Sequence, residues 1–189
     1  GLNMKVYVNE LNNYIDKEIS FSGFIDTIRD KKWVMFVILR DSTGKVQMTL
    51  EKSDENNKEM LEIMNGVSVE STVKVNCKVV SNEAVKLGGI ELIPTSIEVT
   101  SLASNLPYDF NNLDCVNIDT RLDYRWIDLR NEKNMLARQV ESCMVAAIRN
   151  YLYEHDFIEI HTPKLIGTAS ESGSEVFEVK YFDRSAYLA

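Results

Sequence analysis

The sequence lacks long apolar runs, paired cysteines and the start of a secretory signal. No apolar stretch approaches the roughly 18 residues of a transmembrane helix, and the first residues contain neither a basic segment nor an apolar core. Cys77, Cys115 and Cys143 are odd in number and widely separated, without the paired spacing of a zinc site. We therefore expect a cytoplasmic protein with reduced thiols, no membrane association and no metal site.

Histidine and net positive charge are also scarce. His155 and His161 are the only histidines, and neither has a metal-ligating or nucleophilic partner nearby in the sequence, so nothing supports a zinc site or covalent catalysis by a residue of this chain. The net charge of −8 and the pI near 4.9 argue against indiscriminate binding to nucleic acid. A local basic cluster nevertheless lies between Arg29 and Lys45. On its own, this cluster is better explained as a solvated part of the surface.

The first hundred residues have the alternating apolar pattern of β-strands. A hydrophobic content of 44% and a charged content of 26% are typical of a soluble globular protein. Gly23 and Pro94 interrupt two of the strands and indicate a bend, a bulge or an edge position. The expected strands are 19–29, 33–40, 45–50, 73–79 and 90–99, with a helix from Ser53 to about Met64. Five strands with a helix between the third and fourth is the order of an OB-fold β-barrel. An SH3-like barrel is the alternative, but it would not need that helix.

A polar, turn-rich stretch separates this barrel from the rest of the chain. Residues 104–120 are rich in Asn and Asp and contain Pro107, which favours a linker. The expected organisation is a barrel domain over 1–103, a linker over 104–120 and a second domain over 121–189.

The second domain contains an amphipathic helix followed by a proline-bearing strand. The helix is expected from Leu136 to Tyr153, and its apolar residues share one face. That stripe consists of Leu136, Val140, Cys143, Met144, Ala147, Ile148, Tyr151 and Leu152. Phe157, Ile160 and Pro163 then recur at every third position, and Pro163 cannot occupy an ordinary central strand. Periodicity alone fits any helix-to-strand unit of an α+β domain.

Three segments in this order resemble class IIb aminoacyl-tRNA synthetases, the aspartyl, asparaginyl and lysyl group. Residues 121–130 match the pattern R-x-D-x-R-x-x-D-L-R that introduces the family's catalytic domain. The helix and strand resemble motif 1, and residues 162–189 are similar to the T-P-K…E-G-G…Y-F…A-Y-L-A pattern of the archaeal and eukaryotic aspartyl branch. The chain departs from the family at Ser172 and Asp156, where glycine is usual; Asp tolerates a left-handed backbone better than most residues. The resemblance covers residues 5–189.

This resemblance implies an OB-fold anticodon-binding domain followed by the start of an α+β class II catalytic domain. The implied activity is that of an aspartate–tRNA ligase, which activates L-aspartate with ATP and Mg²⁺ and transfers it to tRNA. Motifs 2 and 3, which hold ATP in the family, do not occur in the sequence, so we expect the chain alone to be inactive. The alternatives are an asparaginyl enzyme, a non-catalytic tRNA-binding OB module and an amino-acid-processing paralogue.

The resemblance also implies three groups of functional residues. The anticodon-binding positions are Arg29, Phe36, Gln47 and Glu91. An OB sheet can stack unpaired bases on an aromatic ring and read their edges with amide and carboxylate groups, although Phe36 could equally belong to the core. A loop that closes over the amino-acid pocket contains Ser170, Glu171 and Gly173, with Glu171 suited to the substrate ammonium group. The homodimer interface contains Phe157, Ile160 and Pro163.

Overall fold

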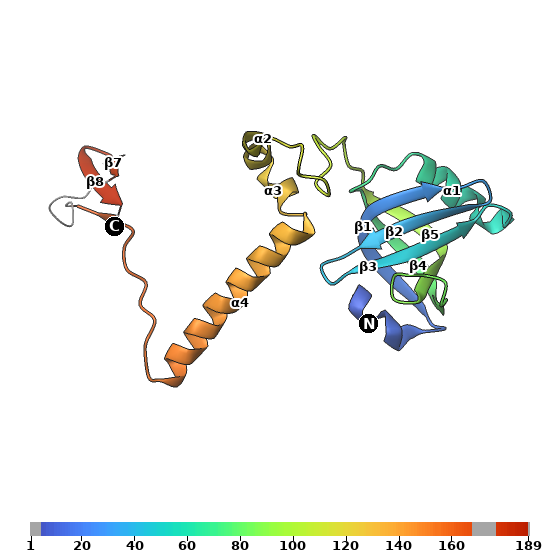
Figure 1. The fold of residues 1–189 in the computed structure, drawn as a ribbon, viewed down its shortest axis with the longest axis horizontal. Helices are drawn as coiled ribbons and strands as arrows, with labels where there is room; N and C mark the ends of the chain where they lie inside the picture. Colours follow the sequence, from blue (N-terminus) through green and yellow to red (C-terminus); the bar gives the residue numbers. More distant parts are fainter. Residues whose placement is uncertain (1–4, 168–176, 189) are drawn as a thin grey trace. The chain divides into compact units, whose positions relative to one another are not determined.

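The alternating residues of the first hundred positions form a ring of paired strands in the computed structural model, which describes residues 5–167 and 177–188. The chain divides into two compact units, Gly1–Pro107 and Tyr108–Ala189. The strands of the first unit are β1 (Glu18–Asp30), β2 (Val34–Arg40), β3 (Lys45–Glu51), β4 (Thr72–Ser81) and β5 (Ile90–Ser101) (Figure 1). Their order, β1-β2-β3-β5-β4, closes into a barrel because β4 also pairs with β1. All pairings are antiparallel except that of β3 with β5.

Short helices accompany the barrel. They are η1 (Val8–Tyr14), η2 (Glu55–Asn57) and α1 (Lys58–Asn65), of which η1 is not foreseen by the sequence pattern. The helix expected between the third and fourth strands is therefore present as η2 and α1. Its apolar side makes it part of the fold, since Met60 and Met64 are buried in the same cluster as the strand residues.

The core lies inside the barrel because alternate residues of each strand point inward. On β4 the four alternating residues Val73, Val75, Cys77 and Val79 are all buried, as the sequence predicts. Phe21 and Ile25 from β1 and residues of β2, β3 and β5 join the same cluster. Burial of each large side chain stabilises the fold by about 1.5–3 kcal/mol. The remaining alternate residues are thereby left on the outer surface.

Irregular positions in the barrel explain two unusual residues. A Cβ atom on Gly23 would lie 2.7 Å from the carbonyl oxygen of Arg40, so glycine is needed for the close approach of β1 and β2. The β1–β2 register shift itself lies between Ile25 and Thr27, not at Gly23. Pro94 adjoins a register shift in the β4–β5 pairing, which confirms the expected bulge.

The second unit begins with two short helices held by a buried carboxylate. Its elements are α2 (Ile118–Asp123), α3 (Arg125–Asp128), α4 (Glu132–Glu154) and a small antiparallel sheet of β6 (Leu165–Ile166), β7 (Glu178–Tyr181) and β8 (Arg184–Leu188), in the order β6-β8-β7. Asp128 is fully buried and accepts hydrogen bonds from Arg121 at 2.6 Å and Arg125 at 3.2 Å. The charged residues of this segment therefore pair with one another, and Asn131 caps α4 by accepting from two backbone N–H groups.

The predicted strand after α4 is wrong. Residues 157–163 have no strand partner among the described residues, and the first strand after the helix is the two-residue β6. A strand needs a neighbour that accepts and donates backbone hydrogen bonds, and Pro163 has no N–H to contribute. The turn into this segment is as expected: Asp156 has a φ of 64°, the left-handed conformation for which glycine or Asp is suited.

Candidate nucleic-acid interface

The candidate site lies on the outer face of β1, β2, β3 and β5. On β2, Met35 and Val37 are buried in the core, so Phe36 between them points outward. The register pairs Phe36 with Arg29 on β1 and with Thr49 on β3, and paired residues share a face.

The same face continues onto β3 and β5. Gln47 precedes Thr49 by two positions and therefore lies on the same side of β3. The parallel pairing of β3 with β5 sets Gln47 beside Glu91. Gln47 and Glu91, 44 positions apart in the sequence, thus lie on adjacent strands. The structure places all four sequence-predicted positions, Arg29, Phe36, Gln47 and Glu91, on one continuous face.

The four side chains of this face are all at least partly accessible to a ligand. Arg29 is exposed, whereas Phe36, Gln47 and Glu91 are half-buried. Phe36 is not a member of the barrel core cluster. Its side chain is therefore partly accessible, which is what stacking of a base requires.

A hydrogen-bonded chain connects the polar members of the face. Thr49 Oγ1 donates to Glu91 Oε2 at 2.6 Å and accepts from Gln47 Nε2 at 3.3 Å. Asn82, directly after β4, donates through Nδ2 to Glu91 Oε1 at 3.0 Å. Thr49 and Asn82 are functional candidates that are not among the positions predicted from the sequence. Strand alternation could have identified Thr49, since it shares a face with Gln47; no sequence signal marks Asn82.

The basic cluster seen in the sequence is divided by the fold. Arg40 forms ion pairs with Asp26 at 2.7 Å and with buried Glu70 at 2.8 Å, and Lys45 lies 3.5 Å from Asp26. Burial of the Arg40 guanidinium lowers its pKa, but hydrogen bonds and charge from Glu70 and Asp26 outweigh this and raise it overall. These two cations therefore have a structural role.

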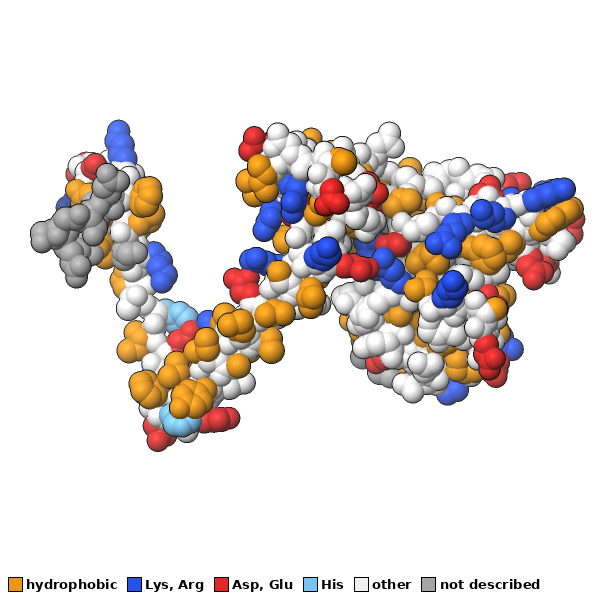
Figure 2. Space-filling model, in the orientation of Figure 1, with side chains coloured by type: hydrophobic (Ala, Val, Ile, Leu, Met, Phe, Trp, Pro, Cys, Tyr) orange, Lys and Arg blue, Asp and Glu red, His pale blue; other side chains and the backbone are white. Residues whose placement is uncertain are grey.

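The other basic residues of the cluster remain at the surface. Arg29, Lys31 and Lys32 are exposed, and Lys32 Nζ lies 4.8 Å from the ring centroid of Trp33, which is itself 70% exposed. Lysine, arginine and apolar side chains lie together on the barrel face that carries β1, β2 and β3 (Figure 2). Such a mixture of cations and aromatic rings suits single-stranded nucleic acid.

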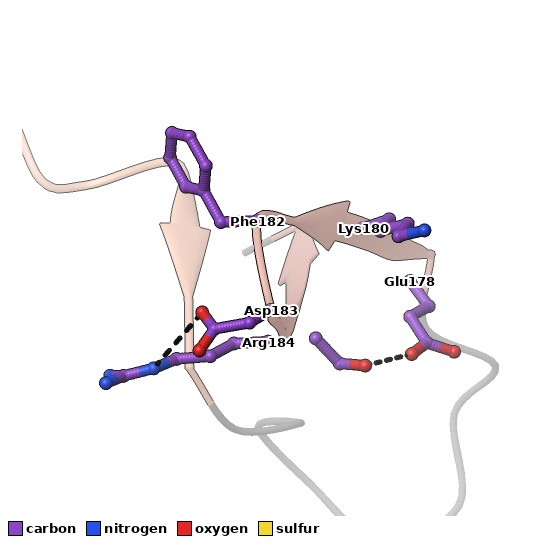
Figure 3. A pocket seen from close by; sticks show the side chains of 6 residues that line it. Glu178, Lys180, Phe182, Asp183 and Arg184 are labelled. Atoms are coloured by element: carbon purple, nitrogen blue, oxygen red, sulfur yellow. Dashed lines mark hydrogen bonds and ion pairs between the residues drawn. The ribbon is translucent and has the colours of Figure 1, made fainter.

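The predicted amino-acid-pocket residues Ser170, Glu171 and Gly173 lie outside the described residues. On the C-terminal side of that loop, β7 and β8 border an open hollow of about 500 Å³. It is lined by Glu178, Lys180, Phe182, Asp183, Arg184 and Ser185 (Figure 3). The Ser185 hydroxyl donates to Glu178, and Asp183 lies 4.0 Å from Arg184. Acidic and basic side chains balance there, so the hollow does not favour a ligand of one charge.

The helix α4 exposes its apolar stripe along its whole length. None of its described residues is buried, and Leu136, Met144 and Ile148 are each about 60% exposed. A groove of about 370 Å³ separates the helix from residues 157–159. Phe157 and Ile160 are 62% and 77% exposed, and Pro163 is also exposed. Large apolar side chains of α4 and of residues 157–163 are thus in contact with water together in the described structure.

Glu159 fixes the segment after α4 to the helix. It accepts from Tyr153 Oη at 2.8 Å and from Arg149 Nε at 3.1 Å. Hydrogen bonding from Tyr153, followed by that from Arg149, lowers the pKa of Glu159. The position of the neighbouring Phe157 and Ile160 is thereby tied to α4.

Two classes of feature are absent from the part of the chain that the structure describes. Residues 5–167 and 177–188 contain no group of three or more His, Cys, Asp or Glu side chains able to hold a metal ion. Among the described helices, none is long and apolar enough to span a membrane.

Comparison with known proteins gives a match to each unit. A family model described as an OB-fold nucleic acid binding domain matches residues 19–100, and one described as tRNA synthetases class II (D, K and N) matches residues 117–189. The chain is 42% identical over 174 residues to an aspartate–tRNA(Asp/Asn) ligase of Methanopyrus kandleri, covering 92% of this chain and 40% of the relative. It is 37% identical to an aspartate–tRNA(Asp) ligase of Pyrococcus horikoshii, covering 97% of this chain and 42% of the relative.

Solved structures of aminoacyl-tRNA synthetases superpose on the chain. The asparaginyl-tRNA synthetase of Pyrococcus horikoshii complexed with asparaginyl-adenylate superposes with a TM-score of 0.88 and 30% identity, over 98% of this chain and 42% of that one. A putative aspartyl-tRNA synthetase from Leishmania major Friedlin gives a TM-score of 0.85 and 30% identity, over 100% of this chain and 39% of that one. The chain thus spans about two-fifths of the length of the relatives it matches.

Proposed function

The chain is a homologue of the aspartate–tRNA ligases, with an OB-fold domain and the start of a class II synthetase domain, and we propose that it supplies anticodon recognition and a dimerisation surface to such a ligase. The proposed division is an anticodon-binding domain over 1–103, a linker over 104–120 and the beginning of the catalytic domain over 121–189. The complete enzyme would activate aspartate with ATP and transfer it to tRNA in the cytoplasm. The resemblance assigns ATP and Mg²⁺ to the complete enzyme through motifs 2 and 3, which this sequence does not contain, so we assign neither to a residue of this chain.

The observation that carries the proposal is the shared face of Arg29, Phe36, Gln47 and Glu91. Four adjacent strands bring a cation, a ring, an amide and a carboxylate to one accessible surface. Phe36 would stack on an unpaired anticodon base, Gln47 and Glu91 would read base edges, and Arg29 would contact a base or the backbone. The net charge of −8 makes this local arrangement, and not overall attraction, the basis of RNA binding.

Replacement of Phe36 tests the proposal directly. Phe36→Ala removes the stacking surface and should weaken binding to an RNA hairpin carrying the aspartate anticodon GUC by about 1–3 kcal/mol, the value of one base stack. Phe36→Tyr keeps the ring and should bind within about threefold of the unmodified chain. Fluorescence anisotropy of a labelled hairpin gives both dissociation constants. An unchanged constant for a folded Phe36→Ala variant would remove this face from the RNA-binding surface.

We also propose that α4 and residues 157–163 form a homodimer interface. The exposed apolar stripe, the groove beside it and the exposed Phe157, Ile160 and Pro163 are continuous along this segment. A two-fold interface would bury the stripe against its own copy and would give residues 157–163 the backbone partners that they lack within the described chain.

A charge placed in the stripe tests the interface. Ile148→Asp should convert a dimer into a monomer in sedimentation equilibrium, because a two-fold interface contains this residue once from each copy. A loss of about 2 kcal/mol per copy raises the dimer dissociation constant roughly 10³-fold. Asn150→Asp adds the same charge at an exposed polar position of α4 and serves as the control. Equal masses for the two variants would contradict the proposal.

Asparagine is the alternative amino acid, because one superposed structure is an asparaginyl-tRNA synthetase. Aminoacylation by the complete protein, with aspartate and asparagine and with both tRNAs, distinguishes the two enzymes. Exclusive charging with asparagine would replace the aspartate assignment.

A further inference from the structure

We propose that Thr49 and Asn82 are positioning residues that fix the Glu91 carboxylate and the Gln47 amide for discrimination between anticodon bases. The inference rests on the proposed anticodon-binding function and concerns how the same face achieves specificity. It starts from the hydrogen-bonded chain Gln47–Thr49–Glu91–Asn82.

Both oxygens of Glu91 have a partner within the protein. Oε2 accepts from the Thr49 hydroxyl on β3, and Oε1 accepts from the Asn82 amide beyond the end of β4. Because the two donors come from different elements, they fix the plane of the carboxylate and not merely its position. A free Glu side chain would lose rotamer entropy on binding a base, whereas a side chain that is already ordered avoids most of this cost.

The chain also fixes the orientation of Gln47. The Thr49 hydroxyl donates its single proton to Glu91 Oε2. Thr49 can then only accept from Gln47, which places the NH₂ group of that amide toward Thr49 and leaves Oε1 available on the other side. Because Thr49 donates to Glu91, it fixes which end of the Gln47 amide faces it.

Asn82 is itself held by the loop that follows β4. Its Oδ1 accepts from the N–H of Ala84 at 3.1 Å, and its own N–H donates to the carbonyl of Gly89 at 2.8 Å. Because Asn82 Oδ1 accepts from Ala84, the Asn82 amide nitrogen is the group that faces Glu91. The orientation of the carboxylate thus depends on the β4–β5 connection as well as on the sheet.

The result is a surface that offers acceptors to a base. Each oxygen of Glu91 uses one lone pair within the protein and keeps another, and Gln47 Oε1 adds a third acceptor. A base edge that presents N–H donors forms hydrogen bonds there, whereas an edge that presents acceptors faces the carboxylate without a partner. Sites built in this way discriminate strongly, because the wrong ligand leaves polar groups unsatisfied.

Isosteric variants of the positioning residues test the inference. Thr49→Val keeps the shape and removes the hydroxyl, and Thr49→Ser is the matched control that restores it. Asn82→Asp retains the acceptor for Ala84 but replaces the donor to Glu91 with a second carboxylate oxygen. Each chain is titrated with the GUC hairpin and with hairpins in which each anticodon base is exchanged in turn.

The quantity measured is the ratio of dissociation constants between exchanged and GUC hairpins. For Thr49→Val and Asn82→Asp we expect this ratio to fall about tenfold at one anticodon position, the value of one lost hydrogen bond, with unaltered ratios at the others. Thr49→Ser should retain the original ratio. A mere loss of folding would weaken all hairpins together, so the positional readout separates positioning from structural damage.

Unchanged ratios at every position in the Thr49→Val chain would overturn the inference, even if Phe36→Ala still weakens binding. If Phe36→Ala has no effect on binding, the proposed RNA-binding face itself fails. The two failures are therefore distinguishable in the same titration.

Discussion

The ion-pair network beneath the barrel surface gives the sharpest stability prediction. Arg40 binds Glu70 through two hydrogen bonds of 2.8 and 2.9 Å and binds Asp26 at 2.7 Å. The Glu70 side chain is 1% exposed and that of Arg40 is 15% exposed, so little solvent can replace a lost partner. Glu70→Gln removes the charge and turns an NH₂ group toward the guanidinium, while the volume stays nearly constant.

The expected cost follows from this geometry. Removing one partner of a buried pair destabilises a protein by about 3–5 kcal/mol, and the lower end applies here because Asp26 continues to bind Arg40. A loss of about 3 kcal/mol would shift the urea midpoint by about 2 M for a slope of about 1.5 kcal/mol per molar. Against a typical total stability of about 5–15 kcal/mol, the effect is large.

Urea unfolding followed by circular dichroism measures this midpoint. Glu98→Gln, an exposed position on β5, is the charge-matched control and should change stability by less than about 0.5 kcal/mol. The double variant Arg40→Met with Glu70→Gln should be less destabilised than the sum of the two single variants, since the pair is coupled. Equal midpoints for Glu70→Gln and Glu98→Gln would refute the reasoning.

Two further predictions concern the interior of the barrel. Gly23→Ala should destabilise the fold by about 1–3 kcal/mol, because its Cβ would lie 2.7 Å from a backbone oxygen that cannot move freely. Gly66→Ala is the control: the nearest atom to its Cβ would be 3.7 Å away, so it should be nearly neutral in the same urea assay. Burial raises the pKa of the Cys77 thiol to about 12, so at pH 8 it stays protonated and should resist iodoacetamide in the folded chain while exposed Cys115 reacts. Mass spectrometry of peptides after alkylation measures both sites, and equal modification of Cys77 and Cys115 in the folded chain would contradict the second prediction.

The strands could be predicted because their burial follows a local rule. Inward and outward residues alternate on β4 without exception from Val73 to Val79, and such a pattern depends only on neighbouring positions. The same rule places Phe36 and Gln47 outside the barrel. The helix α4 is also predictable, but apolar periodicity predicts its start at Leu136, four residues after Glu132, because it does not register the Asn131 cap.

What could not be predicted depends on groups distant in sequence. The strand expected at 157–163 needs a partner that the described part of the chain does not provide. The hydrogen bond from Asn82 to Glu91 depends on the path of the β4–β5 connection, for which Gly88 and Gly89, both with positive φ, indicate a turn but not a direction. Nothing in the sequence distinguishes Arg40 and Lys45 from Lys31 and Lys32, which belong to the same basic cluster. Only the fold shows that the first two form ion pairs with Asp26 and that the other two are exposed.

The short parallel pairing of β3 with β5 has a consequence for the fluctuations of the barrel. In the described register, β3 and β5 are joined at Gln47↔Glu91 and Met48↔Leu92, whereas β4 pairs with β5 along most of its length. This short seam is where amide protons should exchange first with deuterated water, since few backbone bonds must break to open it. A nucleotide bound to both Gln47 and Glu91 would link β3 to β5. RNA binding should therefore slow the exchange of amide protons on both strands at once.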